Sequence, residues 1–318
     1  MKISTLLAGA GLLISSGLAF AQSYPNKPIH FVTGFAAGSS IENLSRIVLD
    51  DISKRTGAVF VVEQRPGALG MIGMNAVAKA PPDGYTLMPT SSATHSSAPQ
   101  LTKMTVADPV KDFTHLGALD RFHLMLVVNA SSGIKTVEDL VAEAKKKSLN
   151  YGYGSATGQV GASAFVRAAG IDRNVVGIPY KSQPLALTDL VGNQVQFVTS
   201  DLPSVDALVR GNKLTALAVS GDKRATLFPD VPTLTERGIN AELIGWVGVA
   251  GPAGLPEEVR TWWQRNLTTT LNRPNVIEDF KARGVEPFIL FGPTLEKFVA
   301  DQYQVWGRHI REAGIKPE

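Results

Sequence analysis

The sequence predicts an α/β protein made of two lobes, between which the chain crosses twice. Two patterns support this prediction. Short apolar runs alternate with helical patterns of apolar residues, and the alternation starts again near residue 124. The length of 318 residues agrees, because a domain commonly holds about 150 residues and two hydrophobic cores fit into such a chain.

The first lobe begins with a strand, a helix, a strand, a helix and a strand, which is typical of a parallel sheet with helices on both faces. Apolar residues recur at helical spacing after the first strand, and Ser39 or Ser40 would cap that helix. The expected strands are residues 29–33, 59–63 and 85–88, and the expected helices are residues 41–52 and 71–80.

The second lobe is expected to begin at a strand of residues 124–128, and the chain returns through a strand of residues 246–250. Two long helices at the C-terminus would then pack back on the first lobe. We therefore expect lobe 1 to hold residues 22–123 and 246–318, and lobe 2 to hold residues 124–245. Between the crossings we expect strands at residues 149–153, 175–178, 195–199 and 215–219, a helix at 137–146 and a helix that ends at Ala169; the last two helices are expected at 256–271 and 293–313.

The N-terminus has the parts of a secretory signal peptide. Lys2 provides a positive charge, residues 3–18 are apolar, and Ala19-Phe20-Ala21 gives the small-x-small pattern that signal peptidase reads. Cleavage after Ala21 would remove residues 1–21 and leave Gln22 as the first residue. We therefore expect an exported protein, and no later stretch of the sequence reaches the about 20 apolar residues that span a bilayer.

The composition excludes several classes of function. The chain has no cysteine, which excludes disulfides, thiol nucleophiles and cysteine-bound metals. Its five histidines show no metal-ligand spacing, so no metal is expected. The formal charge of +3 falls to +2 when Lys2 leaves with the signal peptide, and the basic residues are dispersed, so we expect no nucleic-acid partner.

Three strand-to-helix turns are rich in glycine, serine, threonine and alanine, namely residues 34–40, 90–97 and 154–159. Such a turn places free backbone N–H groups and hydroxyls at the positive end of a helix, where an anion binds without lysine or arginine. Each turn taken alone is more often an ordinary helix cap than an anion site. Because ligands of open α/β sheets bind at the carboxyl ends of strands, we expect the turns to line one cleft between the lobes.

A series of short motifs follows in one order from Tyr24 to the C-terminus, over about 295 residues. The motifs are Tyr24-Pro25-x-Lys27-Pro28-Ile29; Val62-Glu63-Gln64-Arg65-Pro66-Gly67-Ala68 with Gly70, Ile72 and Gly73; Ala76-Val77-Ala78-Lys79-Ala80; Pro82-Asp83-Gly84-Tyr85-Thr86-Leu87; Asp108-Pro109-Val110-Lys111-Asp112-Phe113; Pro179-Tyr180-Lys181; Ala186-Leu187-Thr188-Asp189-Leu190; Leu202-Pro203-Ser204; Leu217-Ala218-Val219; and Phe228-Pro229-Asp230-Val231-Pro232-Thr233. Through these motifs the chain resembles the Bug family, the receptors of tripartite tricarboxylate transporters.

The resemblance implies a type II periplasmic-binding-protein fold, in which two α/β lobes close on an organic acid. It further implies a periplasmic, monomeric receptor without a cofactor, which captures a dicarboxylate or an aromatic carboxylate for membrane permease subunits. The ligand would be held by loop backbone groups, hydroxyls and bridging waters rather than by charged side chains. By position, the ligand-binding residues that the resemblance implies are Phe35, Gly38, Ser39, Ser91, Ser92, Thr94, His95, Ser155, Ala156, Thr157 and Asp201.

Three positions depart from the family pattern and leave the identity of the carboxylate open. The family usually has Gly-Gly where this chain has Gly38-Ser39, and aspartate where it has Glu42. The loop of residues 153–159 also lacks the histidine that often follows it.

Two other classes of function are weaker interpretations. A secreted α/β enzyme is disfavoured, because Gly152-x-Gly154-x-x-x-Gly158 lacks the acidic residue expected about 20 residues further on and no Gly-x-Ser-x-Gly elbow occurs. A binding protein that reports its ligand to a two-component sensor fits the sequence as well as one that serves a permease. We therefore expect a binding protein that is not an enzyme, with transport as the leading hypothesis and sensing as the alternative.

Overall fold

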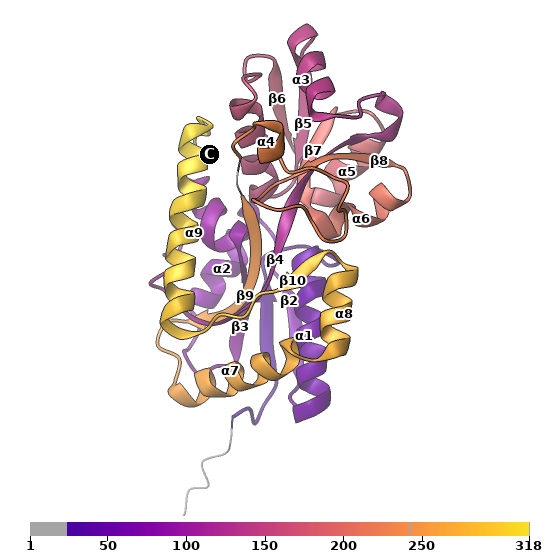
Figure 1. Ribbon diagram of the computed structural model, residues 1–318. Helices are drawn as coiled ribbons and strands as arrows, with labels where there is room; N and C mark the ends of the chain where they lie inside the picture. Colours follow the sequence, from indigo (N-terminus) through magenta and orange to yellow (C-terminus); the bar gives the residue numbers. More distant parts are fainter. Residues whose placement is uncertain (1–23, 242, 318) are drawn as a thin grey trace, which may run out of the picture.

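The computed structural model describes residues 24–241 and 243–317, and Figure 1 shows two α/β bodies stacked one above the other. The signal peptide predicted at residues 1–21, its cleavage site and Gln22 lie outside the described residues. The elements alternate between strands and helices along most of the chain, as the apolar periodicity predicts.

The lower body in Figure 1 is built on five strands in the order β2-β1-β3-β9-β4, with β10 on the far side of β4. Strands β1, β2 and β3 are parallel, whereas β9 runs antiparallel to both β3 and β4. The three strands predicted to form a parallel sheet do so, and the sheet as a whole is mixed, because the returning strand β9 enters antiparallel between β3 and β4. The strands are β1 (Ile29–Thr33), β2 (Phe60–Gln64), β3 (Thr86–Ser91), β4 (Phe113–Asn129), β9 (Ile244–Pro252) and β10 (Val285–Pro287).

The upper body continues from the second half of β4. There β4 pairs antiparallel with β7 and with β8, and β5 lies parallel to both β7 and β6. The strands are β5 (Leu149–Tyr153), β6 (Val175–Pro179), β7 (Phe197–Asp201) and β8 (Leu214–Val219).

The long strand β4 joins the two bodies. It pairs with β9 as far as His123 and with β7 from Leu124 onwards. The change of partner falls between these two residues, where the sequence predicts the first lobe boundary. The division at 123/124 and 245/246 stays a prediction, and this change of pairing supports it; we use "first lobe" and "second lobe" for the two bodies below.

Helices cover both faces of the sheets (Figure 1). Three of them, α5, α6 and α8, were not predicted from the sequence, because each holds only nine residues and begins beside a proline. The α-helices are α1 (Ser40–Thr56), α2 (Met71–Ala78), α3 (Val137–Lys146), α4 (Ala156–Ala168), α5 (Gln183–Val191), α6 (Leu202–Arg210), α7 (Glu257–Leu271), α8 (Pro274–Ala282) and α9 (Gly292–Glu312). Short turns of 3-10 or π type are η1 (Ala68–Gly70), η2 (Ala93–Ser97), η3 (Ala98–Gln100), η4 (Ala130–Ser132) and η5 (Thr235–Arg237).

The C-terminal helices return to the first lobe, with one addition to the prediction. Helices α7 and α8 pack on α1, and α9 packs on η2 and β4. Helix α9 also contacts α4 of the second lobe, so the last helix touches both lobes. Figure 1 shows α9 running along one side of the molecule, with its C-terminal end beside the second lobe.

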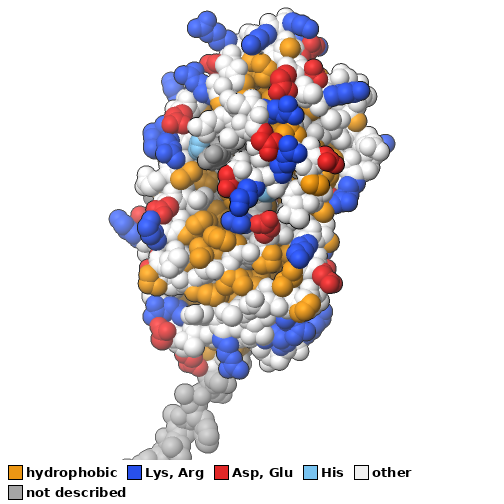
Figure 2. All heavy atoms as spheres, viewed as in Figure 1, with side chains coloured by type: hydrophobic (Ala, Val, Ile, Leu, Met, Phe, Trp, Pro, Cys, Tyr) orange, Lys and Arg blue, Asp and Glu red, His pale blue; other side chains and the backbone are white. Residues whose placement is uncertain are grey.

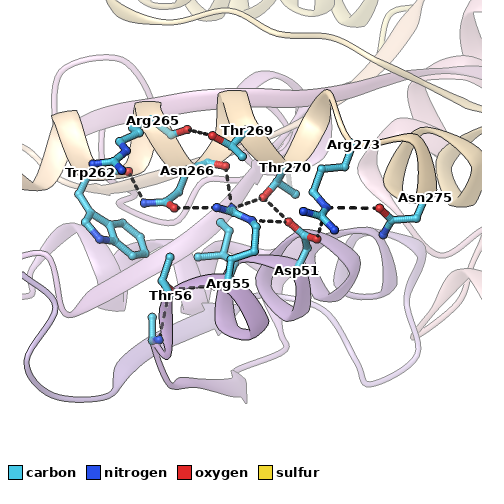
Figure 3. Close-up of polar contacts among 12 residues, drawn as sticks. Asp51, Arg55, Thr56, Trp262, Arg265, Asn266, Thr269, Thr270, Arg273 and Asn275 are labelled. Atoms are coloured by element: carbon cyan, nitrogen blue, oxygen red, sulfur yellow. Dashed lines mark hydrogen bonds and ion pairs between the residues drawn. The ribbon is translucent and has the colours of Figure 1, made fainter.

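A polar network fastens α1 to α7 (Figure 3). The buried carboxylate of Asp51 accepts hydrogen bonds from Arg55 Nε at 2.8 Å and Thr270 Oγ1 at 2.8 Å, and it pairs with Arg273 Nε at 2.9 Å. Arg55 also donates to Asn266 Oδ1 at 3.2 Å. Burial alone would raise the pKa of Asp51, but these hydrogen bonds and cations outweigh it, so the pKa lies below the usual value. Residues from the two ends of the chain therefore form one structural unit.

Candidate functional site

The turn between β1 and α1 carries the first group of predicted site residues. Ser39 caps α1, because its Oγ accepts a hydrogen bond from the backbone N–H of Glu42 at 3.3 Å. Gly38 has a positive φ of 81°, which glycine adopts without strain. Phe35 is half-buried and packs against the main hydrophobic core, which includes residues of both lobes. The turn thus presents the N-terminus of a 17-residue helix beside an aromatic wall.

The loop at Gly67–Gly70 supports this turn, and sequence reasoning did not assign it to the site. A Cβ atom on Gly34 would lie 2.5 Å from the carbonyl oxygen of Gly70, so the two segments touch backbone to backbone. A Cβ on Gly70 would in turn meet Thr94 Cγ2 at 3.0 Å and Phe35 Cζ at 3.6 Å. Phe35 and Thr94 therefore meet over Gly70. The run of glycines at positions 67, 70 and 73 was the signal available in the sequence.

The turn after β3 is buried and bonded within itself. Ser91 Oγ accepts from the backbone N–H of Thr94 at 3.2 Å and lies 3.2 Å from Thr94 Oγ1. Ser92 Oγ accepts from the backbone N–H of Trp246 at 3.4 Å, which links the turn to β9. Because these hydroxyls already have partners, the turn keeps its shape without a ligand.

His95 contacts another predicted site residue, Thr94, and its ring packs at the start of β4. Its ring stacks edge-on against Phe113 at 4.8 Å and against His115 at 5.5 Å, at the start of β4. Nδ1 lies 2.9 Å from Thr94 Oγ1. Burial, and secondly the proximity of His115, lower the pKa of His95 well below its usual value, so the ring is neutral. The geometry therefore presents His95 as a support for Thr94; its contact with ligand stays a prediction.

The second-lobe turn is held by a residue that sequence reasoning missed. Gln183 Oε1 accepts from the backbone N–H of Gly154 at 2.9 Å and from Ser155 Oγ at 3.3 Å, while its Nε2 donates to the Thr199 carbonyl at 3.3 Å. A Cβ on Gly154 would lie 2.1 Å from the backbone of Ser182, so only glycine fits there. Gln183 thereby fixes the turn over the end of β7.

The first turn of α4 closes the second half of the site. Ser155 caps the helix through a 3.1 Å hydrogen bond from the N–H of Gly158, and its Oγ lies 3.3 Å from Thr157 Oγ1. Ala156 and Thr157 are buried. A Cβ on Gly158 would lie 2.9 Å from the Thr199 carbonyl, which places this turn beside the carboxyl end of β7. Helix α4 also contacts η2, so the two predicted half-sites meet across the lobes.

Two aspartates lie at the junction of the lobes. Asp201 ends β7, and its Oδ2 accepts from Ser204 Oγ at 2.6 Å. Asp120, on β4, is fully buried, and neither of its carboxylate oxygens has a hydrogen-bond partner among the described residues. Sequence reasoning missed Asp120, although a single acid within the apolar run of residues 116–128 was a visible signal.

A groove of about 840 Å³ separates the lobes on the side of α1. Gly38 and Ser40 line it from the first lobe, and Pro203 and Ser204 line it from the second. Arg46 and Arg283 also reach it, and Arg46 pairs with Glu42 Oε1 at 2.7 Å. The turn at residues 34–40 thus borders the groove, whereas the turns at residues 90–97 and 154–159 are not among its lining residues.

The chemistry of the site is that of neutral donors. The turns at residues 34–40, 90–97 and 154–159 contain no lysine or arginine, and the helices that begin at the first and third hold 17 and 13 residues. Their N-termini carry partial positive charge and free N–H groups, which suits an anion. No group of three or more potential metal ligands occurs among the described residues. On the face drawn in Figure 2, basic and acidic side chains are interspersed rather than gathered in one field.

The two-lobed α/β fold and a cleft rich in helix N-termini define the class of periplasmic solute receptors. Residues 44–315 match the model of the tripartite tricarboxylate transporter family receptor, TctC. Protein BugT of Bordetella pertussis is 30% identical over 332 residues, which cover 99% of each chain. A UPF0065 protein of Bordetella bronchiseptica is 32% identical over 315 residues, which cover 98% of this chain and 93% of the relative. The chain belongs to the tripartite tricarboxylate transporter receptor family.

Solved structures agree with this assignment. Rpa4515 of R. palustris, solved with adipate, superposes with a TM-score of 0.88 at 27% identity and covers 93% of this chain and 100% of its own. The periplasmic binding protein BugD gives a TM-score of 0.86 at 27% identity, with the same coverage. The predicted family, the fold class and the role as a solute receptor are thereby confirmed. Among the described residues, no helix has the length and apolar character needed to cross a bilayer.

Proposed function

We propose that this receptor captures a small organic carboxylate, with a dicarboxylate or an aromatic carboxylate favoured, and delivers it to membrane permease subunits of a tripartite tricarboxylate transporter. One observation supports the ligand class above all: the turns at residues 34–40 and 154–159 lead into the N-termini of α1 and α4, α4 contacts η2 across the lobes, and the three turns hold no cationic side chain. Adipate in the similar protein Rpa4515 points the same way.

The proposed ligand-binding residues are those of the three turns together with Asp201. Phe35 provides an apolar wall for a methylene chain or a ring, and Thr157 offers a hydroxyl and a backbone N–H at the start of α4. The first-lobe turns form a largely preformed half-site, because Ser91 and Ser92 already have hydrogen-bond partners. The second-lobe turn completes the site when the lobes close, so ligand contacts made only in the closed state shift the population towards it.

Isothermal titration calorimetry on residues 22–318 tests the ligand class. Adipate, malate, citrate and benzoate are the carboxylate probes, with arginine and glucose as controls that carry the wrong charge or none. We expect at least one carboxylate to saturate a single site, while neither control binds. Tight binding of arginine or glucose, and of no carboxylate, would refute the proposal.

We also propose that the protein is exported, that residues 1–21 are removed after Ala21, and that the receptor acts as a monomer without catalytic activity. N-terminal sequencing of the protein recovered from the periplasm tests the cleavage site. The expected first residue is Gln22, and a chain that still begins at Met1 would exclude cleavage.

A further inference from the structure

Asp120 is the strongest unexplained polar feature of the cleft. Its side chain is fully buried, and both carboxylate oxygens lack a hydrogen-bond partner among the described residues. Removing a carboxylate from water without a partner is costly, and a folded protein normally avoids it by pairing or by protonation. The contrast with Asp51, which has two arginines, shows that this chain pairs a buried acid where the acid is structural.

Strand register places Asp120 on the same face of the sheet as Ser91, a predicted site residue. Residues paired across neighbouring strands point to the same face of a sheet. Asp120 pairs with Val247 on β9, and Val247 pairs with Ser91 on β3, so Asp120 and Ser91 lie on one face about 10 Å apart, or two strand spacings. Along β4 the same face continues to Leu124, which pairs with Asp201.

The second lobe covers this face with α4. The pairing of Leu124 with Asp201 puts Thr199, two residues before Asp201, on the same face, and a Cβ on Gly161 of α4 would meet both Thr199 Cγ2 at 2.7 Å and Leu124 Cδ1 at 3.0 Å. The hydroxyl of Thr199 is also buried without a partner. Asp120 therefore shares one face of the sheet with Ser91 and with Leu124, and α4 covers this face at Leu124.

The charged groups that face Asp120 are few. Its partners in register on β9 and β10 are Val247 and Pro287, which do not titrate. Arg121 alternates to the opposite face, where it pairs with Glu286 at 3.2 Å and lies over the ring of Phe288. Residues 155–159, 202–205 and 34–41 contain no charged side chain, and the neutral ring of His95 is turned towards Phe113. The first turn of α1 adds the buried Glu42, whose Oε1 pairs with Arg46 at 2.7 Å.

Asp201 is the remaining charged neighbour. Burial, and secondly the negative charge of Asp201, raise the pKa of Asp120 well above the usual range of an aspartate. Because no cation faces Asp120, an ionised Asp120 would repel a ligand carboxylate in the same cleft. A protonated carboxyl group, in contrast, has an O–H donor, and hydrogen bonds from such a donor to a carboxylate are short and strong.

We infer that Asp120 acts as a neutral carboxylic acid at the back of the cleft and donates a hydrogen bond to a carboxylate of the bound ligand. This inference rests on the proposed function, since it names the group that recognises the ligand. It makes Asp120 a specificity-determining residue that favours an anion without relying on lysine or arginine. The alternative, an ionised Asp120 that binds an ammonium group, is an outcome of the test.

Two substitutions distinguish the contribution of the hydrogen-bond donor to ligand binding from the contribution of side-chain shape. Asp120→Asn keeps a donor of the same size, and Asp120→Leu keeps the branched shape without a donor. The probe is whichever of adipate, malate or citrate binds the wild-type protein most tightly, titrated by calorimetry at about pH 8, where aspartate is ordinarily ionised. We expect Asp120→Asn to bind within about threefold of wild type and Asp120→Leu to bind roughly 10- to 150-fold more weakly.

The proton itself is measured by infrared spectroscopy at the same pH. We expect the C=O stretch of a protonated carboxyl group in the wild-type protein, its loss in Asp120→Asn, and its retention in the control Asp301→Asn, where an exposed acid on α9 pairs with Lys297. A missing band in the wild-type protein overturns the inference, as does equal affinity of Asp120→Leu and wild type, or an equal loss in both variants.

The same titrations distinguish failure of this inference from failure of the proposed function. Wild-type preference for 2-aminoadipate over adipate, lost in Asp120→Asn, would show an ionised Asp120 facing an ammonium group and would overturn the inference alone. If none of the carboxylates binds the wild-type protein, the proposed function is wrong, and the ligand contact inferred for Asp120 is wrong with it.

Discussion

Two buried aspartates of this receptor stand in opposite environments. Asp51 joins α1 to α7 and α8 through Arg55, Thr270 and Arg273, and its pKa is lowered (Figure 3). Asp120 lies at the junction of the lobes with no partner, and its pKa is raised. Burial alone therefore does not define the role of an acidic side chain. A paired acid holds two segments together, whereas an unpaired one lowers stability and is expected where a ligand meets it.

The largest expected effect is on the stability conferred by Asp51. Asp51→Ala should lower the free energy of unfolding by about 3 kcal/mol, because it leaves two arginines beside a buried site without their shared anion. Urea denaturation measures the change. The matched control Asp301→Ala removes an exposed acid and should cost less than about 1 kcal/mol. Equal losses of unfolding free energy in the two variants would show that the network in Figure 3 does not stabilise the fold.

The two aspartates should also respond to pH with opposite signs. The folded-state pKa of Asp51 is lowered, so its contribution to stability is present above the unfolded pKa of about 3.9 and is lost as the pH falls through the folded value. The folded-state pKa of Asp120 is raised. The contribution of Asp120 to stability is therefore fully present below the unfolded pKa of about 3.9 and is lost as the pH rises through the folded value.

Melting curves of the ligand-free variants across pH measure this contrast. Asp51→Asn should be less stable than wild type at neutral pH and approach it in acid. Asp120→Asn should match wild type in acid and exceed it by about 1–2 kcal/mol at high pH, because Asp120 of the wild-type protein ionises more readily in the unfolded chain than in the folded one. Parallel curves for Asp120→Asn and wild type over the whole range would show that Asp120 is not perturbed.

Much of the fold could be predicted from the sequence, because apolar periodicity reports burial directly. Strand β1 and helix α3 begin and end at the predicted residues. The mixed sheet could not be predicted, since the order of β9 between β3 and β4 depends on contacts between residues more than 120 positions apart. The contact of α9 with α4 could not be predicted from the sequence for the same reason.

Alanine substitutions in the two predicted half-sites should have smaller effects, one mainly on stability and the other mainly on carboxylate binding. Ser92→Ala removes the acceptor for the buried N–H of Trp246 and should lower stability by about 1 kcal/mol. Thr157→Ala should change the melting temperature little, because among the described residues the hydroxyl of Thr157 has one long hydrogen bond, to Ser155 Oγ at 3.3 Å, and should weaken carboxylate binding roughly tenfold. Paired melting and titration experiments measure both. If Thr157→Ala binds the carboxylate as tightly as wild type, the second-lobe turn is an ordinary helix cap and not part of the ligand site.

The site was predicted less completely than the fold. Glycine- and serine-rich turns mark helix N-termini in the sequence, and Ser39 and Ser155 do cap α1 and α4. Side-chain direction is not encoded locally, which is why His95 proved to face Phe113 and why Gln183, distant in sequence from the turn it holds, was missed.

The smallest expected effect concerns Ser39. Its 3.3 Å hydrogen bond to the N–H of Glu42 is long, so Ser39→Ala should lower stability by about 0.5 kcal/mol. Ser39→Gly, which preserves a favourable cap backbone, should cost less. Urea denaturation of the pair checks this order, and a loss near 3 kcal/mol would mean that α1 depends on its cap rather than on the Asp51 network.

The most direct test of the central claim, that a carboxylate is bound by neutral donors, is a crystal structure of residues 22–318 with adipate. We expect one ligand between the lobes, with a carboxylate within hydrogen-bond distance of the first turn of α4 and of Asp120. A carboxylate paired instead with Arg46 or Arg283 in the interlobe groove would contradict it, because a cationic side chain would then recognise the anion.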